Sequence, residues 1–176
     1  PAIKQTSNIE EVYDLGDKRK WHWECPHCKT YIPMEWQIKN EDGSYSGIKW
    51  KLDEKGELIV NSVHYECQNC KGTILETQKP ILNSAGKWIP TAQPKRENFR
   101  SYQLNALVIP PGFTSWVDLV YQWLDACPSN DVIDEDKLKA FVNTRLGQTW
   151  EEKGTAPKVT ELMQNTRSYE VGIVPD

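Results

Sequence analysis

Two pairs of cysteines are the residues of this sequence that are best suited to chemistry. Each pair has the spacing C-x-x-C, and residues 29–66, 38 in all, separate the two pairs. A gap of two residues lets both thiolates of a pair face one ion, and a second pair completes the tetrahedron that zinc prefers. The spacing therefore predicts one structural Zn²⁺ ion with four ligands: Cys25, Cys28, Cys67 and Cys70.

Other uses of these cysteines have less support in the residues. A redox-active C-x-x-C usually stands singly at the start of a helix in a βαβ unit, and no such unit is evident. A disulfide framework is typical of small secreted proteins, but residues 1–5 lack the apolar core of a secretory signal. A catalytic zinc needs an open position, which four thiolates would close. His64, three residues before Cys67, could replace one thiolate, and this alternative stays open.

A zinc hydrolase or deaminase is a hypothesis from a different class. His64-Tyr65-Glu66 has the H-x-E spacing of a deaminase. That signature also needs a proline directly before its C-x-x-C pair, and Glu66 precedes Cys67 here. The sequence contains neither a Gly-rich phosphate loop nor a G-x-S-x-G motif. We therefore expect no catalytic site in this chain.

Three further groups of residues have both a functional and a structural interpretation. An acidic run resembles a metal site, although acids at a helix start explain it more simply; it contains Asp131, Asp134, Glu135 and Asp136. A basic strip could contact phosphates but is more often a solvated face; it contains Lys87, Lys95, Arg96 and Arg100. Aromatic side chains could stack bases, but packing around the metal is favoured; they are Trp21, Trp23, Trp36, Trp50, Tyr65 and Trp88. Structural roles are expected for His22, His27 and Cys127.

Short strands must position the cysteines. Each pair directly follows a stretch typical of a strand, at 21–23 and 63–66, and Lys71-Gly72 provides a sharp turn after the second pair. Two strand-turn-strand units that face one ion form a zinc ribbon. Further short strands are expected at 34–38, 48–52, 58–60, 73–75 and 86–90.

Helical patterns flank this β-rich region. Ser7 and Glu10 form a capping-box pattern, which predicts a short helix that ends at Gly16. Ser115 with Asp118 predicts the start of a second helix. Its apolar stripe contains Trp116, Leu119, Val120, Trp123 and Leu124. A third helix is expected at 134–146. The fold class is therefore α+β, a zinc-ribbon-like small antiparallel β module followed by a short helical segment.

Composition excludes several classes of protein. The net charge of −4 provides no global basic field for nucleic acid. There is no apolar run near 18 residues, so a membrane span is not expected. Leu, Ile, Val and Phe make up about 22% of the chain, which argues against one large apolar core. The chain begins with Pro1 rather than methionine, so we expect a fragment or a processed chain.

Several separate motifs resemble phage terminase large subunits of the lambda-like GpA family. The succession from Ser7-Asn8-Ile9 through Gly16-Asp17-Lys18-Arg19-Lys20-Trp21 to the first cysteine pair is similar to this family. So is the stretch 65–72, followed by Gly86-Lys87-Trp88. Ser115-Trp116 also resembles the family, and residues 141–152 resemble its F-x-N-T-x-L-G-x-x-W segment. Residues 167–176 resemble the lead-in to its nuclease domain.

The resemblance implies a zinc-binding connector region of a viral DNA-packaging motor, in which the parent protein drives DNA translocation with ATP and cuts genomes with a nuclease. It implies four segments: 1–20 as the end of the ATPase domain or a connector, 21–90 as the zinc-ribbon β module, 91–150 as a helical linker subdomain, and 151–176 as a flexible lead-in to the nuclease domain. Only the four cysteines correspond to functional residues of the family, as zinc ligands. The parent would also need ATP and Mg²⁺.

The partners that the resemblance implies are DNA, through the parent motor, the terminase small subunit, the portal and other large-subunit copies, without a membrane. The implied location is the cytoplasm of the bacterial host. We also expect the apolar stripe of the helix that starts at Ser115 and ends near Cys127 to stay partly exposed and to dock on the ATPase domain. The alternative function is a stand-alone zinc-ribbon nucleic-acid-binding module, which would bind DNA with a steep salt dependence.

Overall fold

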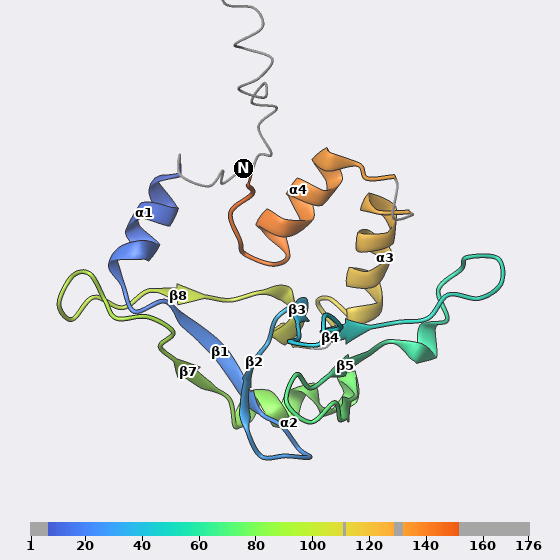
Figure 1. Cartoon of the computed structure of the whole chain (residues 1–176), viewed down its shortest axis with the longest axis horizontal. Coiled ribbons are helices and arrows are strands. Elements are labelled where there is room, and N and C mark those ends of the chain that lie inside the picture. Colours follow the sequence, from blue (N-terminus) through green and yellow to red (C-terminus); the bar gives the residue numbers. More distant parts are fainter. Residues whose placement is uncertain (1–6, 111, 129–131, 152–176) are drawn as a thin grey trace, which may run out of the picture.

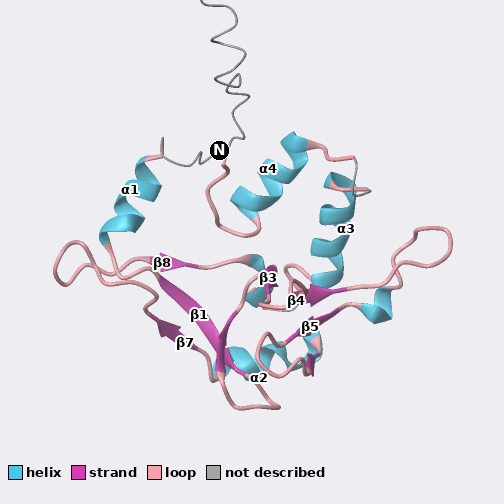
Figure 2. Cartoon of the chain, in the orientation of Figure 1, coloured by secondary structure: helices cyan, strands magenta, loops and turns pink. Residues whose placement is uncertain are grey.

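The computed structural model describes residues 7–110, 112–128 and 132–151, and it combines short strands with short helices (Figures 1 and 2). Within these ranges the helices are α1 (Asn8–Leu15), α2 (Lys79–Ser84), α3 (Trp116–Ala126) and α4 (Glu135–Thr144). The strands are β1 (Arg19–Glu24), β2 (Tyr31–Pro33), β3 (Gln37–Lys39), β4 (Tyr45–Lys49), β5 (His64–Glu66), β6 (Thr73–Ile74), β7 (Lys87–Ile89) and β8 (Tyr102–Gln103). The fold is α+β, as expected. The described helices are all too short, or too polar, to cross a bilayer.

The first sheet is built around β1. β2 and β7 pair with β1 in antiparallel orientation, and β8 pairs in parallel with its first two residues. Aromatic residues favour strands, and β1 contains two tryptophans. Trp23 is fully buried, while Trp21 packs edge-on against Trp88 of β7, with ring centroids 5.1 Å apart. This sheet therefore joins the strand before the first cysteine pair to residues between 65 and 83 positions later in the chain.

The second sheet has the antiparallel order β3-β4-β5-β6. Residues 31–36 run from the first sheet to the second, and along them buried residues alternate with half-buried ones. The amide of Met34 donates to the carbonyl of Trp21 in the first sheet (3.3 Å), and the amide of Ile48 in the second sheet donates to the carbonyl of Trp36 (2.9 Å). The alternation that predicted a strand at 34–38 is present in the burial of these residues. However, residues 34–36 cross from the first sheet to the second, and only the end of the expected segment belongs to a strand, β3.

Two other expected strands differ in the structure. The strand expected at 48–52 is β4 at Tyr45–Lys49, and residues 58–60 lead into a 3₁₀ turn at Val60–Ser62. The hydroxyl of Ser62 accepts from the amide of Lys51 (2.8 Å) and donates to the carbonyl of Ile59 (2.6 Å). A side chain that bonds to nearby backbone in this way competes with sheet pairing. The expectation of a strand at 58–60 was therefore wrong.

Side-chain capping hydrogen bonds start two of the three helices that the sequence predicts. The hydroxyl of Ser115 accepts from the amide of Asp118, and the Asp118 carboxylate accepts from the amide of Ser115, both at 3.0 Å. Asp134 caps α4 by accepting from the amide of Lys137 (3.1 Å). α1 begins after Ser7, but the side chain of Ser7 makes no cap hydrogen bond. The helix there is confirmed, and the capping box is not.

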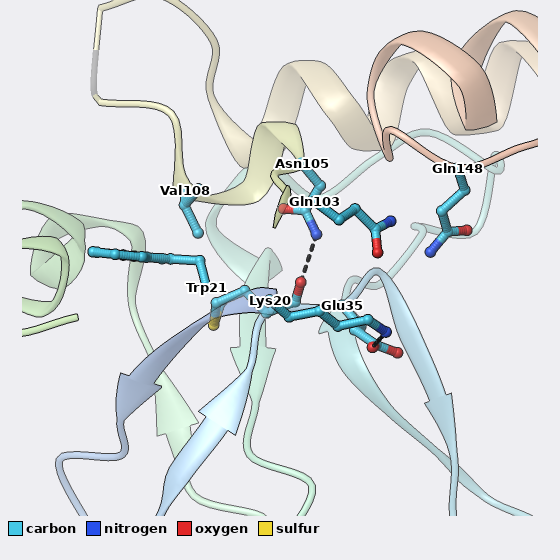
Figure 3. A pocket seen from close by; sticks show the side chains of 8 residues that line it. Lys20, Trp21, Glu35, Gln103, Asn105, Val108 and Gln148 are labelled. Carbon is cyan, nitrogen blue, oxygen red and sulfur yellow. Dashed lines mark hydrogen bonds and ion pairs between the residues drawn. The ribbon is translucent and has the colours of Figure 1, made fainter. Parts of the chain in front are cut away.

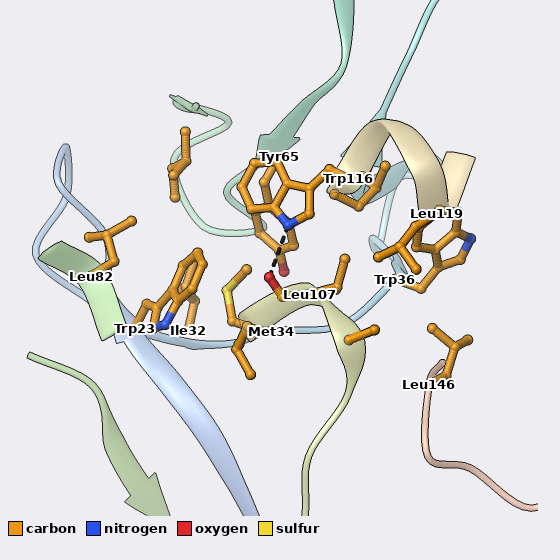
Figure 4. Packing of buried hydrophobic residues seen from close by; sticks show 14 of the residues in the cluster. Trp23, Ile32, Met34, Trp36, Tyr65, Leu82, Leu107, Trp116, Leu119 and Leu146 are labelled. Carbon is orange, nitrogen blue, oxygen red and sulfur yellow. Dashed lines mark hydrogen bonds between the residues drawn. The ribbon is translucent and has the colours of Figure 1, made fainter. Parts of the chain in front are cut away.

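A single cluster of buried side chains extends from β1 to the residues that follow α4 (Figure 4). Trp116 of α3 has no exposed surface and packs on Trp23 of the first sheet and Tyr65 of the second. The ring centroids are 6.3 and 6.2 Å apart. Because each aromatic ring buries a large area, these side chains let a sequence with few aliphatic residues form a shared core.

The apolar stripe of α3 is mostly buried inside this chain: Trp123 and Leu124 at its end are half-buried, so the expected partial exposure is confined to these two residues. Trp116, Leu119 and Val120 are each 0% exposed. Trp123 is half-buried and packs against Trp36, with ring centroids 5.5 Å apart. The expectation treated α4 as the only partner of α3 within the chain. Aromatic side chains from the sheets and from the segment between them provide the rest of the cover, namely Trp23, Tyr65 and Trp36.

Candidate metal centre

The two C-x-x-C pairs form two turns with the same backbone hydrogen bonds. In the first turn the amide of Cys25 donates to the carbonyl of Thr30 (2.9 Å), and in the second the amide of Cys67 donates to the carbonyl of Gly72 (3.0 Å). The lysine after each pair donates its amide to the carbonyl of the first cysteine, at 2.9 Å in both turns. Both lysines have a left-handed backbone, with φ of 60° and 59°. The turns are therefore equivalent, and each follows a strand, β1 or β5.

The four sulfur atoms of these turns lie within 4.8 Å of one another. The Sγ atoms of Cys25 and Cys70 are 3.8 Å apart, and those of Cys28 and Cys67 are 4.0 Å apart. A tetrahedron with Zn–S distances of about 2.3 Å has edges of about 3.8 Å. All four thiols are free rather than paired in disulfides. The arrangement is therefore compatible with one Zn²⁺ ion held between the turns.

Burial and hydrogen bonding divide the thiols into an inner and an outer pair. Cys25 and Cys67, at the strand ends, have no exposed surface, and burial raises the pKa of both thiols, to about 12 for Cys67. Cys28 is half-buried, and the Asn69 side-chain amide donates to its Sγ (3.5 Å). This hydrogen bond, with further ones from Thr30, lowers the pKa of the Cys28 thiol to about 5. A bound dication stabilises the thiolate form of its ligands and so offsets the cost of burying the inner pair.

Each turn also contacts the other through a residue between its two cysteines. In the first turn, Nε2 of His27 lies 2.8 Å from the carbonyl oxygen of Thr73, and a Cβ at Gly72 would lie only 2.5 Å from the His27 ring. In the second turn, Asn69 takes the position of His27 and donates to Oγ1 of Thr30 (3.1 Å). Thr30 is itself the equivalent of Gly72. The contacts are thus reciprocal, and a large ring faces glycine where a smaller amide faces threonine.

The remaining histidines and the fifth cysteine lie outside the sulfur cluster. Nδ1 of His64 is 2.7 Å from the carbonyl oxygen of Ser62, and the cluster contains no imidazole nitrogen. The geometry therefore favours four thiolates over the alternative in which His64 is a ligand. His22 is buried, with Nδ1 2.9 Å from the carbonyl oxygen of Lys20. Cys127 is half-buried at the end of α3, where burial raises the pKa of its thiol.

The acidic run serves a helix start where the structure describes it. Asp134 is the N-cap of α4, and Glu135 and Asp136 lie in its first turn. Asp131 lies outside the described residues. Within the described ranges, the four cysteines form the only group of three or more potential ligand side chains close enough to hold one ion.

The basic strip contacts the rest of the chain at several points. The ammonium of Lys87 lies over the Tyr31 ring, 4.5 Å from its centroid. The guanidinium of Arg96 lies 5.6 Å from the centroid of the Phe99 ring, and Lys95 lies 3.9 Å from a carboxylate oxygen of α1. Cation–π and ion-pair contacts explain these side chains as parts of a solvated face.

Two hollows in the described part of the chain lie away from the cysteines. A cavity of about 10 Å³ lies beside β1 and is lined by residues such as Lys20, Glu35 and Asn105 (Figure 3). Lys20 pairs with Glu35 there, and the Asn105 side-chain amide donates to the carbonyl of Met34. A space of this size is just large enough for about one water molecule. An open groove of about 520 Å³ lies between α1, β8 and the segment after α4.

The polar contacts made by Asn83 of α2 could not be predicted from the sequence. Oδ1 of Asn83 accepts from the indole nitrogens of Trp23 (2.9 Å) and Trp21 (3.3 Å), and its Nδ2 donates to the carbonyl of Val108 (2.7 Å). Asn83 therefore ties β1 to the segment before α3. A helix of six residues completes less than two turns, so it has too little periodicity to be recognised.

Two family models match this chain. The model described as "Phage terminase large subunit gpA, ATPase domain" matches residues 1–88, and "Terminase large subunit gpA, endonuclease domain" matches residues 99–176. The terminase large subunit of Enterobacteria phage P21 is 31% identical over 170 residues, which cover 86% of this chain and 24% of that protein. The terminase large subunit of Escherichia phage lambda is 26% identical over 190 residues, which cover 100% of this chain and 28% of that protein. No solved structure matches.

These matches define a phage terminase component that includes parts of two family domains. The chain belongs to the lambda-like gpA family of phage terminase large subunits, as its motifs had indicated. It spans about a quarter of the length of the curated relatives. The cysteines lie in the region matched by the ATPase-domain model, whereas α3 and α4 lie in the region matched by the endonuclease-domain model.

Proposed function

We propose that this chain is the zinc-binding connector of a viral DNA-packaging terminase large subunit, a zinc-ribbon-like joint between its ATPase and endonuclease domains. The observation that carries the proposal is the convergence of four thiols beside a core to which both matched regions contribute. Zn²⁺ enclosed by four thiolates acts as a structural cross-link and leaves no open position for a substrate. The proposed ligands are Cys25, Cys28, Cys67 and Cys70.

Contacts between the two matched regions support the role of a joint. β8 pairs in parallel with β1, with Arg19 opposite Tyr102 and Lys20 opposite Gln103. The side chain of Asn83 donates across the same boundary to Val108 (2.7 Å). Because these contacts are backbone pairing and buried packing, they favour a fixed orientation between the parts that lie at either end.

The parent protein would use ATP and Mg²⁺ to move DNA and would cut it with its nuclease domain. We place that activity in the cytoplasm of the bacterial host, with DNA, the terminase small subunit, the portal and other large-subunit copies as partners. The connector itself would contribute position rather than catalysis. Accordingly, we assign no catalytic residue to this chain.

A DNA titration at several salt concentrations, combined with an ATP hydrolysis assay, tests this role on the purified chain. A connector is expected to bind DNA weakly and to hydrolyse no ATP. Tight binding whose affinity falls steeply with salt would overturn the connector role in favour of a stand-alone nucleic-acid reader. Stoichiometric ATP turnover by the pure chain would also contradict the proposal.

A further inference from the structure

The first residue of α3 rests on the two strands that lead into the cysteine turns. Trp23 stands two residues before Cys25, and Tyr65 stands two residues before Cys67. Residues two apart on an extended chain share a face, and all four of these side chains are fully buried. The ring of Trp116 packs on both aromatic rings, with centroid distances of 6.3 and 6.2 Å. Figure 4 shows Trp116 directly beside Tyr65. The start of α3 therefore packs on side chains from both of the strands that the metal would hold together.

A second contact joins the second cysteine turn to the same end of α3. β6 leads from this turn to Glu76, whose two carboxylate oxygens lie 2.9 and 3.0 Å from the amide nitrogen of Trp116 and accept its hydrogen bond. The same carboxylate pairs at 2.7 Å with Lys79, which is completely buried. A carboxylate is favoured at a helix N-terminus, where the backbone amides and the helix dipole attract it. The ion pair with the buried Lys79 ammonium holds the half-buried carboxylate in that place.

We propose that metal binding controls the docking of α3, so that removal of the ion releases the first turn of the helix. The inference rests on the proposed zinc site. Without the ion, only the hydrogen bonds of His27 and Asn69 join the two turns directly within the described part of the chain. The four sulfur atoms are then no longer held at their mutual distances, so Trp23 and Tyr65 lose their fixed separation. Trp116 then loses its packing on these two rings, and β6 no longer positions Glu76 against the amide of Trp116. Since the cysteines and α3 belong to different matched regions, the metal would couple the ATPase side to the endonuclease side.

Residue-resolved hydrogen exchange of the Trp116 amide tests this coupling in the full 176-residue chain. The Zn²⁺-loaded chain is expected to protect this amide, and chelation is expected to speed its exchange about tenfold or more, the scale of one hydrogen bond to a charged group. Zinc content is measured on the same samples. If chelation leaves the exchange rate unchanged in a chain that had bound one Zn²⁺, the inference is overturned and the proposed function stays intact. A chain that binds no Zn²⁺ would overturn both.

A variant separates docking from metal binding. Glu76→Ala alone would strand the buried charge of Lys79, so the double variant Glu76→Ala/Lys79→Met is used. It is expected to retain Zn²⁺ and to lose protection of the Trp116 amide about tenfold. Glu57→Ala, at an exposed glutamate in a loop, serves as the control and should change neither readout. Full protection of the Trp116 amide in the double variant would contradict the role of Glu76.

Discussion

The two cysteine turns have the same backbone conformation but differ in the side chains that face the other turn. Where the first turn has His27 and Thr30, the second has Asn69 and Gly72. The imidazole of the first turn lies against the glycine of the second, and the amide of the second turn donates to the threonine of the first (3.1 Å). The two copies of the motif thus have the same conformation but complementary side chains. Neither turn makes these contacts alone, so we expect the turns to fold as a pair.

The same comparison distinguishes the cysteines. The first cysteine of each turn is buried at a strand end, two residues after an aromatic residue of the core. The second cysteines differ, because Cys28 is half-buried and accepts a hydrogen bond from Asn69, whereas Cys70 is exposed. The inner positions therefore belong to both the proposed metal site and the core. Substitutions there should have the larger effect.

The largest effect is expected from Cys67→Ser. It removes a proposed ligand and buries a hydroxyl, and structural Zn²⁺ sites contribute about 10–16 kcal/mol of apparent binding free energy that is coupled to folding. Both turns should lose structure, and because α3 rests on Tyr65, its ellipticity should fall as well. Circular dichroism and zinc content measure this. Cys70→Ser should keep more structure, and Cys127→Ser, outside the cluster, should keep both signals. Full zinc content in Cys67→Ser would contradict the assignment of ligands.

Trp116→Ala tests whether the two turns share one core with α3. Its ring is 0% exposed, and loss of a buried tryptophan typically costs about 3–5 kcal/mol. Tyr121, on the same helix, is 50% exposed, and its substitution by alanine should change the free energy of unfolding by no more than about 0.5 kcal/mol. Urea denaturation of the Zn²⁺-loaded chain measures both. If both variants lose the same free energy of unfolding, α3 does not depend on the packing of Trp116.

Gly72→Ala examines the difference between the turns directly. The added methyl group would lie 2.5 Å from the His27 ring and 3.2 Å from Sγ of Cys70, so a destabilisation of about 1–3 kcal/mol is expected. His27→Ala removes the obstacle, and the double variant should recover most of that loss. In the first turn the equivalent Thr30 already carries a side chain. Additive effects of the two substitutions, measured by urea denaturation, would argue against the proposed steric fit.

Asn69→Ala is expected to have the smallest effect. Outer hydrogen bonds to metal ligands typically change metal affinity about 10–100-fold, and the 3.5 Å contact between Asn69 and Cys28 is a weak one. We therefore expect a loss near tenfold, measured by competition with a chromophoric chelator. Asn61→Ala, at an exposed residue of the 3₁₀ turn, is the matched control. An unchanged affinity in Asn69→Ala would leave the outer cysteine without its assigned support.

Residues with strong local signals could be predicted from the sequence. The spacing of the cysteines predicted two turns after strands, and the Ser115 and Asp118 pair predicted the start of α3. The shared core could not be predicted, because Trp116 meets Trp23 across 93 positions and no local pattern indicates that contact. For the same reason the apolar stripe was assigned to a missing partner.

The reciprocal contacts between the turns could not be predicted from the sequence either. The facing of His27 and Gly72 is evident only when the two turns are placed together in space. β8 pairs through two residues, and α2 contains six, so both elements are too short for a periodic signal. Tertiary contacts fix these elements, and single-sequence patterns do not record such contacts.

The most direct test of the central claim is zinc K-edge X-ray absorption of the purified chain, with zinc content determined on the same sample. We predict one Zn²⁺ per chain and a first shell of four sulfur atoms at about 2.3 Å. A folded chain without metal would contradict the account. A first shell that includes nitrogen or oxygen, or cysteines recovered as disulfides, would contradict it as well.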